Sequence, residues 1–158
     1  MIWLLLACGG TSPENRVRSE EHQNPVEIQT VGGKYRLTWQ SLPSPVPMGD
    51  LFVVETTLKD KDGKTIENGT VRVDARMPAH GHGMATRPLA ALPTCTGAQE
   101  EAALRSTLEA GSLPEGCSYP GGKYKMEGMK FHMPGEWTLR FDVTGPAGAD
   151  HAELRYAL

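Results

Sequence analysis

The sequence lacks three features that would place it in a common functional class. Its formal net charge is only −3 at pH 7 and it has no basic stripe, so nothing indicates a nucleic-acid partner. No apolar run approaches the roughly 20 residues of a transmembrane helix. No Ser/His/Asp order, paired catalytic carboxylates or phosphate-binding glycine loop is present, and we expect a protein that is not an enzyme. The carboxylates on expected strands fall at outward positions: Asp74, Glu127, Glu136 and Asp142.

Cysteine is scarce, and the three residues divide into two groups. Cys8 ends Leu5-Leu6-Ala7-Cys8, which resembles a lipobox, so residues 1–8 are interpreted as the remnant of a lipoprotein signal. The basic start and long apolar stretch of such a signal are missing, and a truncated ordinary signal peptide is the alternative. Either interpretation predicts export, and lipidation of Cys8 predicts a periplasmic or outer-membrane lipoprotein held to the membrane by its N-terminal lipid.

Export to an oxidising compartment predicts a disulfide between the two remaining cysteines, Cys95 and Cys117. Closing a loop of about two dozen residues is worth about 3 kcal/mol in the chain-entropy model. The alternative is that both thiols bind a metal. The disulfide is preferred because the cysteines lie well away from the His- and Met-rich segments of the chain.

Alternating apolar and polar residues predict an all-β fold. Alternation is visible at 34–40, 51–58, 71–77, 124–133, 137–143 and 152–156, with an Asp-Gly hairpin turn at 60–64. About seven short strands with frequent turns favour an immunoglobulin-like β-sandwich over residues 34–158, and residues 9–33 are expected to form a flexible tether. An insertion at 86–122 should contain a helix from Gln99 to Ala110, started by a capping box at Thr96.

Histidine and methionine gather in two short windows, although the chain has only five histidines and seven methionines. Met77–Met84 reads Met-Pro-Ala-His-Gly-His-Gly-Met, and Met129–Met133 reads Met-Lys-Phe-His-Met. Thioether sulfur and imidazole nitrogen together suit copper, especially Cu(I). If the two windows meet in space, they can form a copper site.

Strand parity narrows the candidate ligands. Residues two apart in an extended segment share a face, which places His80, His82 and Met84 together. In the second window, a regular strand puts Phe131 on the core side and His132 on the other. Met77 and Met129 then lean toward the core, because methionine often fills gaps beside aromatic rings. The predicted metal ligands are His80, His82, Met84, His132 and Met133, with His132 and Met133 treated as alternatives.

The two windows also carry a family resemblance. Met-Pro-x-His-x-His-Gly-Met after a strand, and Phe-x-Met-Pro-Gly-x-Trp opening another, resemble the YtkA-like domain family, which is related to FixH-type proteins. The resemblance covers roughly residues 34–158, with the helical insertion as an addition. It implies an immunoglobulin-like sandwich outside the cytoplasmic membrane, with an association to copper handling. The ligand style is also similar to that of periplasmic copper chaperones of the PCuAC type.

The leading hypothesis is an exported copper-binding protein that buffers the metal or delivers it to a protein partner. Free imidazole has a pKa of about 6.5, so histidine ligation predicts binding that weakens below about pH 6. The competing hypothesis is a metal-free interaction module of the cell envelope, because the same fold serves many binding roles.

Overall fold

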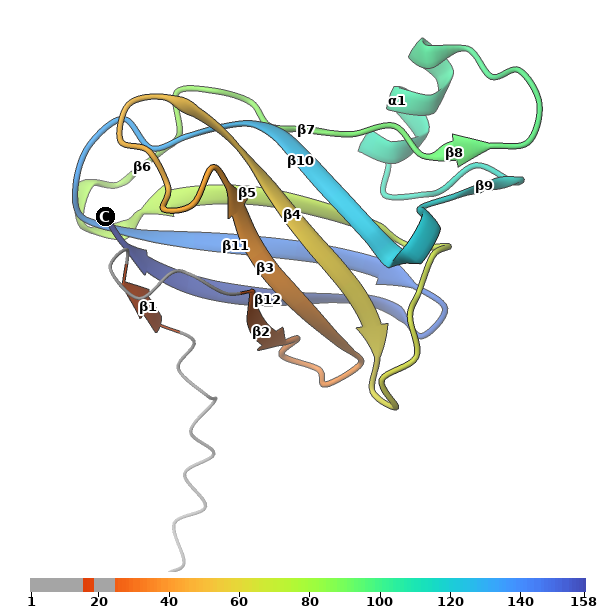
Figure 1. The fold of residues 1–158 in the computed structure, drawn as a ribbon, viewed down its shortest axis with the longest axis horizontal. Helices are drawn as coiled ribbons and strands as arrows, with labels where there is room; N and C mark the ends of the chain where they lie inside the picture. Colours follow the sequence, from red (N-terminus) through yellow and green to blue (C-terminus); the bar gives the residue numbers. More distant parts are fainter. Residues whose placement is uncertain (1–15, 19–24) are drawn as a thin grey trace, which may run out of the picture.

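The computed structural model describes residues 16–18 and 25–158. Two five-stranded sheets face each other across one hydrophobic core, which confirms the expected all-β sandwich (Figure 1). The first sheet has the order β1–β12–β11–β5–β6 and the second β2–β3–β4–β10–β7. Neighbouring strands are antiparallel except for β1 and β12. The strands are β1 (Arg16–Arg18), β2 (Val26–Gln29), β3 (Tyr35–Leu42), β4 (Leu51–Asp60), β5 (Thr70–Met77), β6 (His82–Gly83), β7 (Leu89–Ala90), β8 (Thr94–Cys95), β9 (Cys117–Ser118), β10 (Lys123–Lys130), β11 (Glu136–Gly145) and β12 (Gly148–Ala157).

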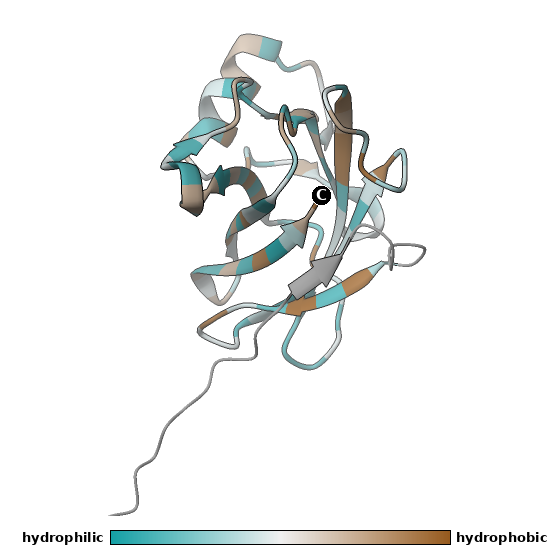
Figure 2. Cartoon of the chain, turned by 90° about the vertical axis from the view of Figure 1, so that its left-hand side faces the viewer, coloured by the Kyte–Doolittle hydropathy of each residue, from teal (hydrophilic) through white to brown (hydrophobic). Residues whose placement is uncertain are grey.

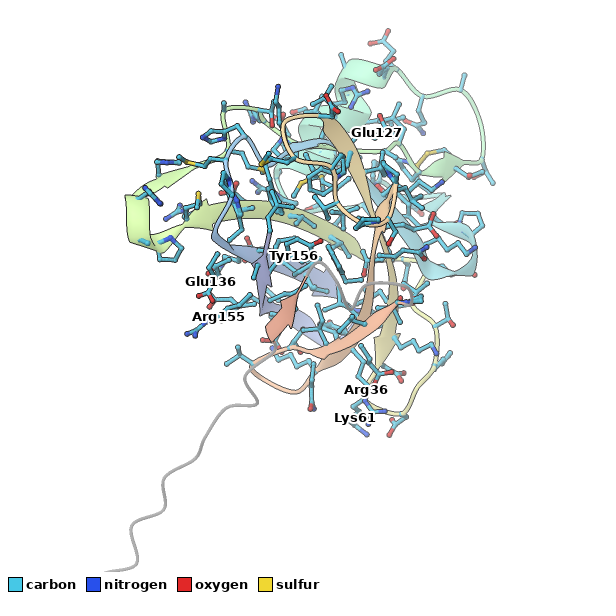
Figure 3. The ribbon with its side chains drawn as sticks, turned by 60° about the vertical axis from the view of Figure 1, so that its left-hand side comes forward. Arg36, Lys61, Glu127, Glu136, Arg155 and Tyr156 are labelled. Atoms are coloured by element: carbon cyan, nitrogen blue, oxygen red, sulfur yellow. A yellow bond between two sulfur atoms is a disulfide. The ribbon has the colours of Figure 1, made fainter. Side chains whose placement is uncertain are left out.

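The alternation seen in the sequence matches the alternation of burial along the strands. On β3, for example, Tyr35, Leu37 and Trp39 are buried while their neighbours reach the surface. Brown and teal segments alternate along the strands in Figure 2 for this reason. Figure 3 shows the same rule in the first sheet, where Glu136 and Arg155 project outward and Tyr156 points between the sheets.

A β-bulge in β10 changes which residues face the core. The pairing of β10 with β4 shifts register between Met126 and Met129, and Gly128 between them has a left-handed φ of 80°. Met126 is buried before the bulge, and Met129 and Phe131 are buried after it. Because the extra residue reverses the parity, His132 emerges on the solvent side at the end of the segment.

The folded part begins earlier than expected, so the prediction of a tether through residue 33 is wrong. Strand β2 pairs with β3 within the predicted tether, and its Ile28 is fully buried. Four residues with only Val26 and Ile28 as apolar members are too short to produce a periodic signal. The remaining tether residues 9–15 and 19–24, which include His22, lie outside the described residues, as does the predicted signal remnant at 1–8.

The insertion forms a lobe at one end of the sandwich (Figure 1). The predicted disulfide is confirmed: Cys95 and Cys117 are bonded and pair directly between β8 and β9. The predicted helix is also present as α1 (Glu101–Glu109). It begins at Glu101, two residues after the predicted start at Gln99, and the side chain of its N-cap residue, Glu100, makes no capping hydrogen bond. The capping box at Thr96 is wrong, because the Thr96 hydroxyl donates to the Gly116 carbonyl at 3.1 Å instead.

Two tyrosines in ring contact attach this lobe to the second sheet. The ring centroids of Tyr119 and Tyr124 lie 4.4 Å apart. The Tyr119 hydroxyl donates to the Ala91 carbonyl at 3.0 Å, and the Tyr124 hydroxyl donates to the Ile66 carbonyl at 2.8 Å. Burial raises the pKa of both phenols to about 12, so they stay neutral donors across the physiological range.

Asp150, at the start of the last strand, joins β12 to the β2–β3 turn. Its carboxylate accepts the backbone N–H groups of Gly32 at 3.0 Å, Lys34 at 3.3 Å and His151 at 2.8 Å. Burial acts to raise the pKa of Asp150, but these bonds and one from the Thr30 side chain outweigh it and hold the pKa below its usual value.

Replacing Asp150 with asparagine should lower the free energy of unfolding by about 1–2 kcal/mol at neutral pH, because three backbone donors lose a charged acceptor. The folded-state pKa is below the unfolded value of about 3.9, so this stabilisation is complete above that pH and disappears as pH falls through the folded pKa. Urea unfolding at neutral and acid pH measures it. The exposed Asp62→Asn serves as control, and an equal Asp150→Asn effect at both pH values would contradict the assignment.

Candidate metal centre

The first His/Met window folds as a tight turn at one end of the sandwich. Pro78–His80 form a 3-10 helix, and Gly81 ends it with its N–H donating to the Met77 carbonyl at 3.0 Å. The chain then returns as β6, with His82 opposite Met77 in the antiparallel register. The prediction that strand parity groups His80 with His82 is therefore wrong, because proline starts a helical turn there. A turn, not an extended strand, brings the two imidazoles together.

The second window forms the loop between β10 and β11. Trp137, at the start of β11, donates its indole N–H to the Met133 carbonyl at 3.1 Å. Gly135 exchanges two backbone hydrogen bonds with Leu158, at 3.1 and 3.2 Å. A Cβ on Gly135 would lie 2.8 Å from Met77 Cε, and its φ of 129° also favours glycine. This loop is thus fixed against the end of β5 that starts the first window.

Three imidazoles from the two windows meet at this end of the sandwich. The ring centroids of His80 and His82 are 5.8 Å apart, and those of His82 and His132 are 5.3 Å apart. Two imidazoles on one tetrahedral ion have centroids about 5 Å apart, since metal–nitrogen bonds are about 2.0 Å long. His82 is the central ring, approached by one histidine from its own turn and one from the other loop.

Trp137 lies beneath this histidine cluster. Its ring is fully buried and meets His132 edge-on at 5.4 Å and His82 at 6.4 Å between centroids. The other side of the cluster is open, because His80, His82 and His132 are all exposed. The imidazoles are therefore supported from the core and accessible to a ligand from solvent.

The hydrogen bond of His82 determines which nitrogen is available. Its Nδ1 lies 3.0 Å from the Gly83 carbonyl oxygen, which can only accept, so Nδ1 carries the proton. The lone pair of neutral His82 is then on Nε2. Metal-binding histidines commonly donate their second ring nitrogen to a backbone carbonyl in this manner.

The methionines of the two windows differ in how deeply they are buried. Met77 and Met129 are buried in the core, as their strand parity indicated. Met84 and Met133 are half-buried and pack against the core from its edge. Met84 is also held to β5, because its N–H donates to the Ala75 carbonyl at 3.2 Å. Only the half-buried pair can offer sulfur without first leaving the core.

Nitrogen and oxygen donors alone do not complete a metal site at the histidine cluster. Within residues 16–18 and 25–158, no group of three His, Cys, Asp or Glu side chains is placed to hold a metal ion. Thioether sulfur is not one of these donors. The three histidines approach one another in a chain around His82 and do not converge on one point, so a bound ion would require rotation of the exposed His80 or His132 side chains.

Two further residues belong to this end of the fold and were not singled out as site residues. In the sequence, Trp137 is the last residue of the Phe-x-Met-Pro-Gly-x-Trp motif and the first apolar residue of a strand, and its place beneath the histidines depends on the sheet pairing. Met48 is 60% exposed and bridges to Phe131, while the N–H of Gly49 donates to the Phe131 carbonyl at 2.8 Å. An exposed thioether therefore lies beside the segment that ends in His132, on the proline-rich loop between β3 and β4.

The predicted lipidation site, Cys8, lies outside the described residues. In the part of the chain that the structure describes, no helix is long and apolar enough to cross a membrane.

Comparisons with known proteins assign no family. A scan against protein-family models found no match, and a search of curated proteins found no similar sequence.

Proposed function

We propose that this protein binds copper at the histidine cluster and buffers it or delivers it to a protein partner. The observation that supports this most strongly is the 5.3 Å approach of His82, on the turn after β5, to His132, on the loop after β10. The approach of imidazoles from two separate segments at an open end of the fold supports a shared ligand. The orientation of His82, with Nε2 free, adds to this support.

The ligand chemistry favours copper over hard ions. Imidazole nitrogen comes from His80, His82 and His132, and thioether sulfur from Met84 or Met133 at the edge of the core. Soft sulfur together with imidazole suits Cu(I), whereas magnesium and calcium prefer oxygen ligands. Exposed ligands on loops also favour exchange of the metal with a partner over permanent storage.

Export, lipidation at Cys8 and membership of the YtkA-like family complete the proposal. They rest on the lipobox-like Leu5–Cys8 and on the two sequence motifs, and they place the copper site outside the cytoplasmic membrane. An immunoglobulin-like topology is proposed on the same resemblance. The disulfide Cys95–Cys117 is consistent with an oxidising compartment.

The experiment is a Cu(I) titration of the purified full chain against a competing chelator. The His80→Ala/His82→Ala double variant should bind Cu(I) at least about 100-fold more weakly. Removing only the hydrogen-bond partner of a metal ligand already lowers metal affinity by roughly 10- to 100-fold, and removing the ligands themselves should lower it at least as much. His151→Ala, which removes a histidine on β12 away from the cluster, is the matched control and should bind like the wild type.

Two results would contradict copper binding. One is wild-type affinity no greater than that of a free peptide of residues 77–84, and the other is unchanged affinity in the double variant. Either result would favour the competing function, a metal-free interaction module of the cell envelope.

A further inference from the structure

A cavity of about 290 Å³ lies between the insertion and the first sheet. Its walls come from β5, from the loop that leads into β7, from α1 and from one residue each of β10 and β11. Figure 1 shows α1 and β7 along one edge of the sandwich, and residues of both line the cavity. Its volume is near the lower limit for small-molecule sites, about 300 Å³. The cavity shares no residue with the histidine cluster.

The inner part of the cavity is apolar. Val73, Leu108 and Met126 line it, and each is at most 5% exposed. Leu108 belongs to the helix, so the disulfide-closed insertion supplies one side of this apolar wall. More accessible apolar surface comes from Pro88, Leu89 and Ala90, of which Leu89 is 43% exposed. A ligand with a short hydrocarbon body would gain free energy by covering this surface.

One positive group at the charged rim has no carboxylate partner among the described residues. Asp142 is 2.9 Å from Arg140, and Glu109 is 3.2 Å from Arg87. The other charged lining residues also pair, Asp74 with Arg76 at 4.0 Å and Arg105 with Glu101 at 2.8 Å.

Arg72 differs from these residues. Its Nη1 donates to the Glu109 backbone carbonyl at 3.1 Å, near the C-terminal end of α1. Among the described residues, no carboxylate lies within 4.0 Å of its guanidinium, although Asp142 is its cross-strand neighbour. The remaining N–H groups of Arg72 can therefore take an anion at the cavity rim, and the planar guanidinium fits a carboxylate in two-point contact.

Thr86 adds a second polar group to the same cavity. Its hydroxyl oxygen is buried and has no hydrogen-bond partner among the described residues, which is unusual for a buried polar atom. Rotation of the Thr86 side chain toward the cavity would let a ligand oxygen satisfy this hydroxyl.

We propose that this cavity binds a small monocarboxylate with an apolar body. The carboxylate pairs with Arg72 and accepts from the Thr86 hydroxyl once that side chain rotates, and the apolar body covers Pro88 and Leu89. This site is separate from the copper site and does not require it.

The test uses hexanoate as the probe, with the metal-free full chain and NMR shifts of the backbone amides of Thr86, Arg87, Leu89 and Ala90. Hexanoate should saturate these shifts at millimolar concentration, as expected for a ligand of this size. Acetate lacks the apolar body, and hexylamine and 1-hexanol lack the anion, so each should bind at least about tenfold more weakly.

Two variants locate the site. Arg72→Gln should weaken hexanoate roughly tenfold or more, whereas Arg36→Gln, an exposed arginine on the opposite sheet, should not change it. Thr86→Val keeps the side-chain shape and should weaken hexanoate several-fold, which gives a second test if Arg72→Gln loosens the helix. The proposal is overturned if hexanoate does not saturate, if 1-hexanol or inorganic phosphate binds equally well, or if neither variant changes the affinity.

Discussion

The Trp137→Ala variant should lose about 3–5 kcal/mol of unfolding free energy, the largest effect expected for a single substitution in this chain. Trp137 is fully buried and stacks on Phe131, with ring centroids 4.6 Å apart and planes inclined by 8°. Phe131 in turn contacts Phe52 and Tyr156, so the stack connects the two sheets. Truncating Trp137 would leave a cavity at the centre of these contacts.

Trp137→Phe is the matched control for this prediction. It keeps an aromatic ring against Phe131 and removes the indole N–H that binds the Met133 carbonyl. Loss of that single bond and some ring volume should cost about 1–2 kcal/mol. Urea unfolding of both variants measures the difference, and a Trp137→Ala loss below 1 kcal/mol would show that this stack contributes little to stability.

Removing the disulfide should have the second-largest effect, a loss of about 3 kcal/mol in the Cys95→Ala/Cys117→Ala variant. The bond joins residues separated by 22 positions and closes the loop that contains α1. Without it, the unfolded chain gains conformational freedom, and the two-residue strands β8 and β9 lose their covalent link.

Chemical unfolding with and without a reducing agent measures this contribution. The wild type under reducing conditions should match the double variant, and the variant should not respond to the reductant. If the unfolding free energy is unchanged while the helical signal in circular dichroism disappears, the insertion unfolds separately and the disulfide stabilises only that lobe.

The sandwich could be predicted because each long strand carries its own signal. On β3, β5 and β11, one face must be buried, so apolar residues alternate with polar ones over eight or more positions. Strand β2 has no such signal, since its four residues are buried only through pairing with β3. The helix start was displaced because Thr96 bonds to Gly116, a tertiary contact that local capping patterns do not reveal.

The candidate site could be predicted in composition but not in geometry. The two windows identified the histidines, and the core positions of Met77 and Met129 followed from parity. The turn at Pro78 and the place of Trp137 beneath the rings depend on how β5, β10 and β11 end in space. Residues that are distant in sequence become neighbours only through this sheet pairing.

A thermodynamic cycle on His82 and His132 tests most directly whether the two loops hold one copper ion. Cu(I) affinity is measured for the wild type, His82→Ala, His132→Ala and the double variant. We expect each single variant to lose roughly 10- to 100-fold in Cu(I) affinity. The loss in the double variant should be smaller than the product of the two single-variant losses, because removing either histidine already disrupts the same site. Wild-type affinity in His132→Ala, or losses that multiply as for independent sites, would contradict a shared copper ion.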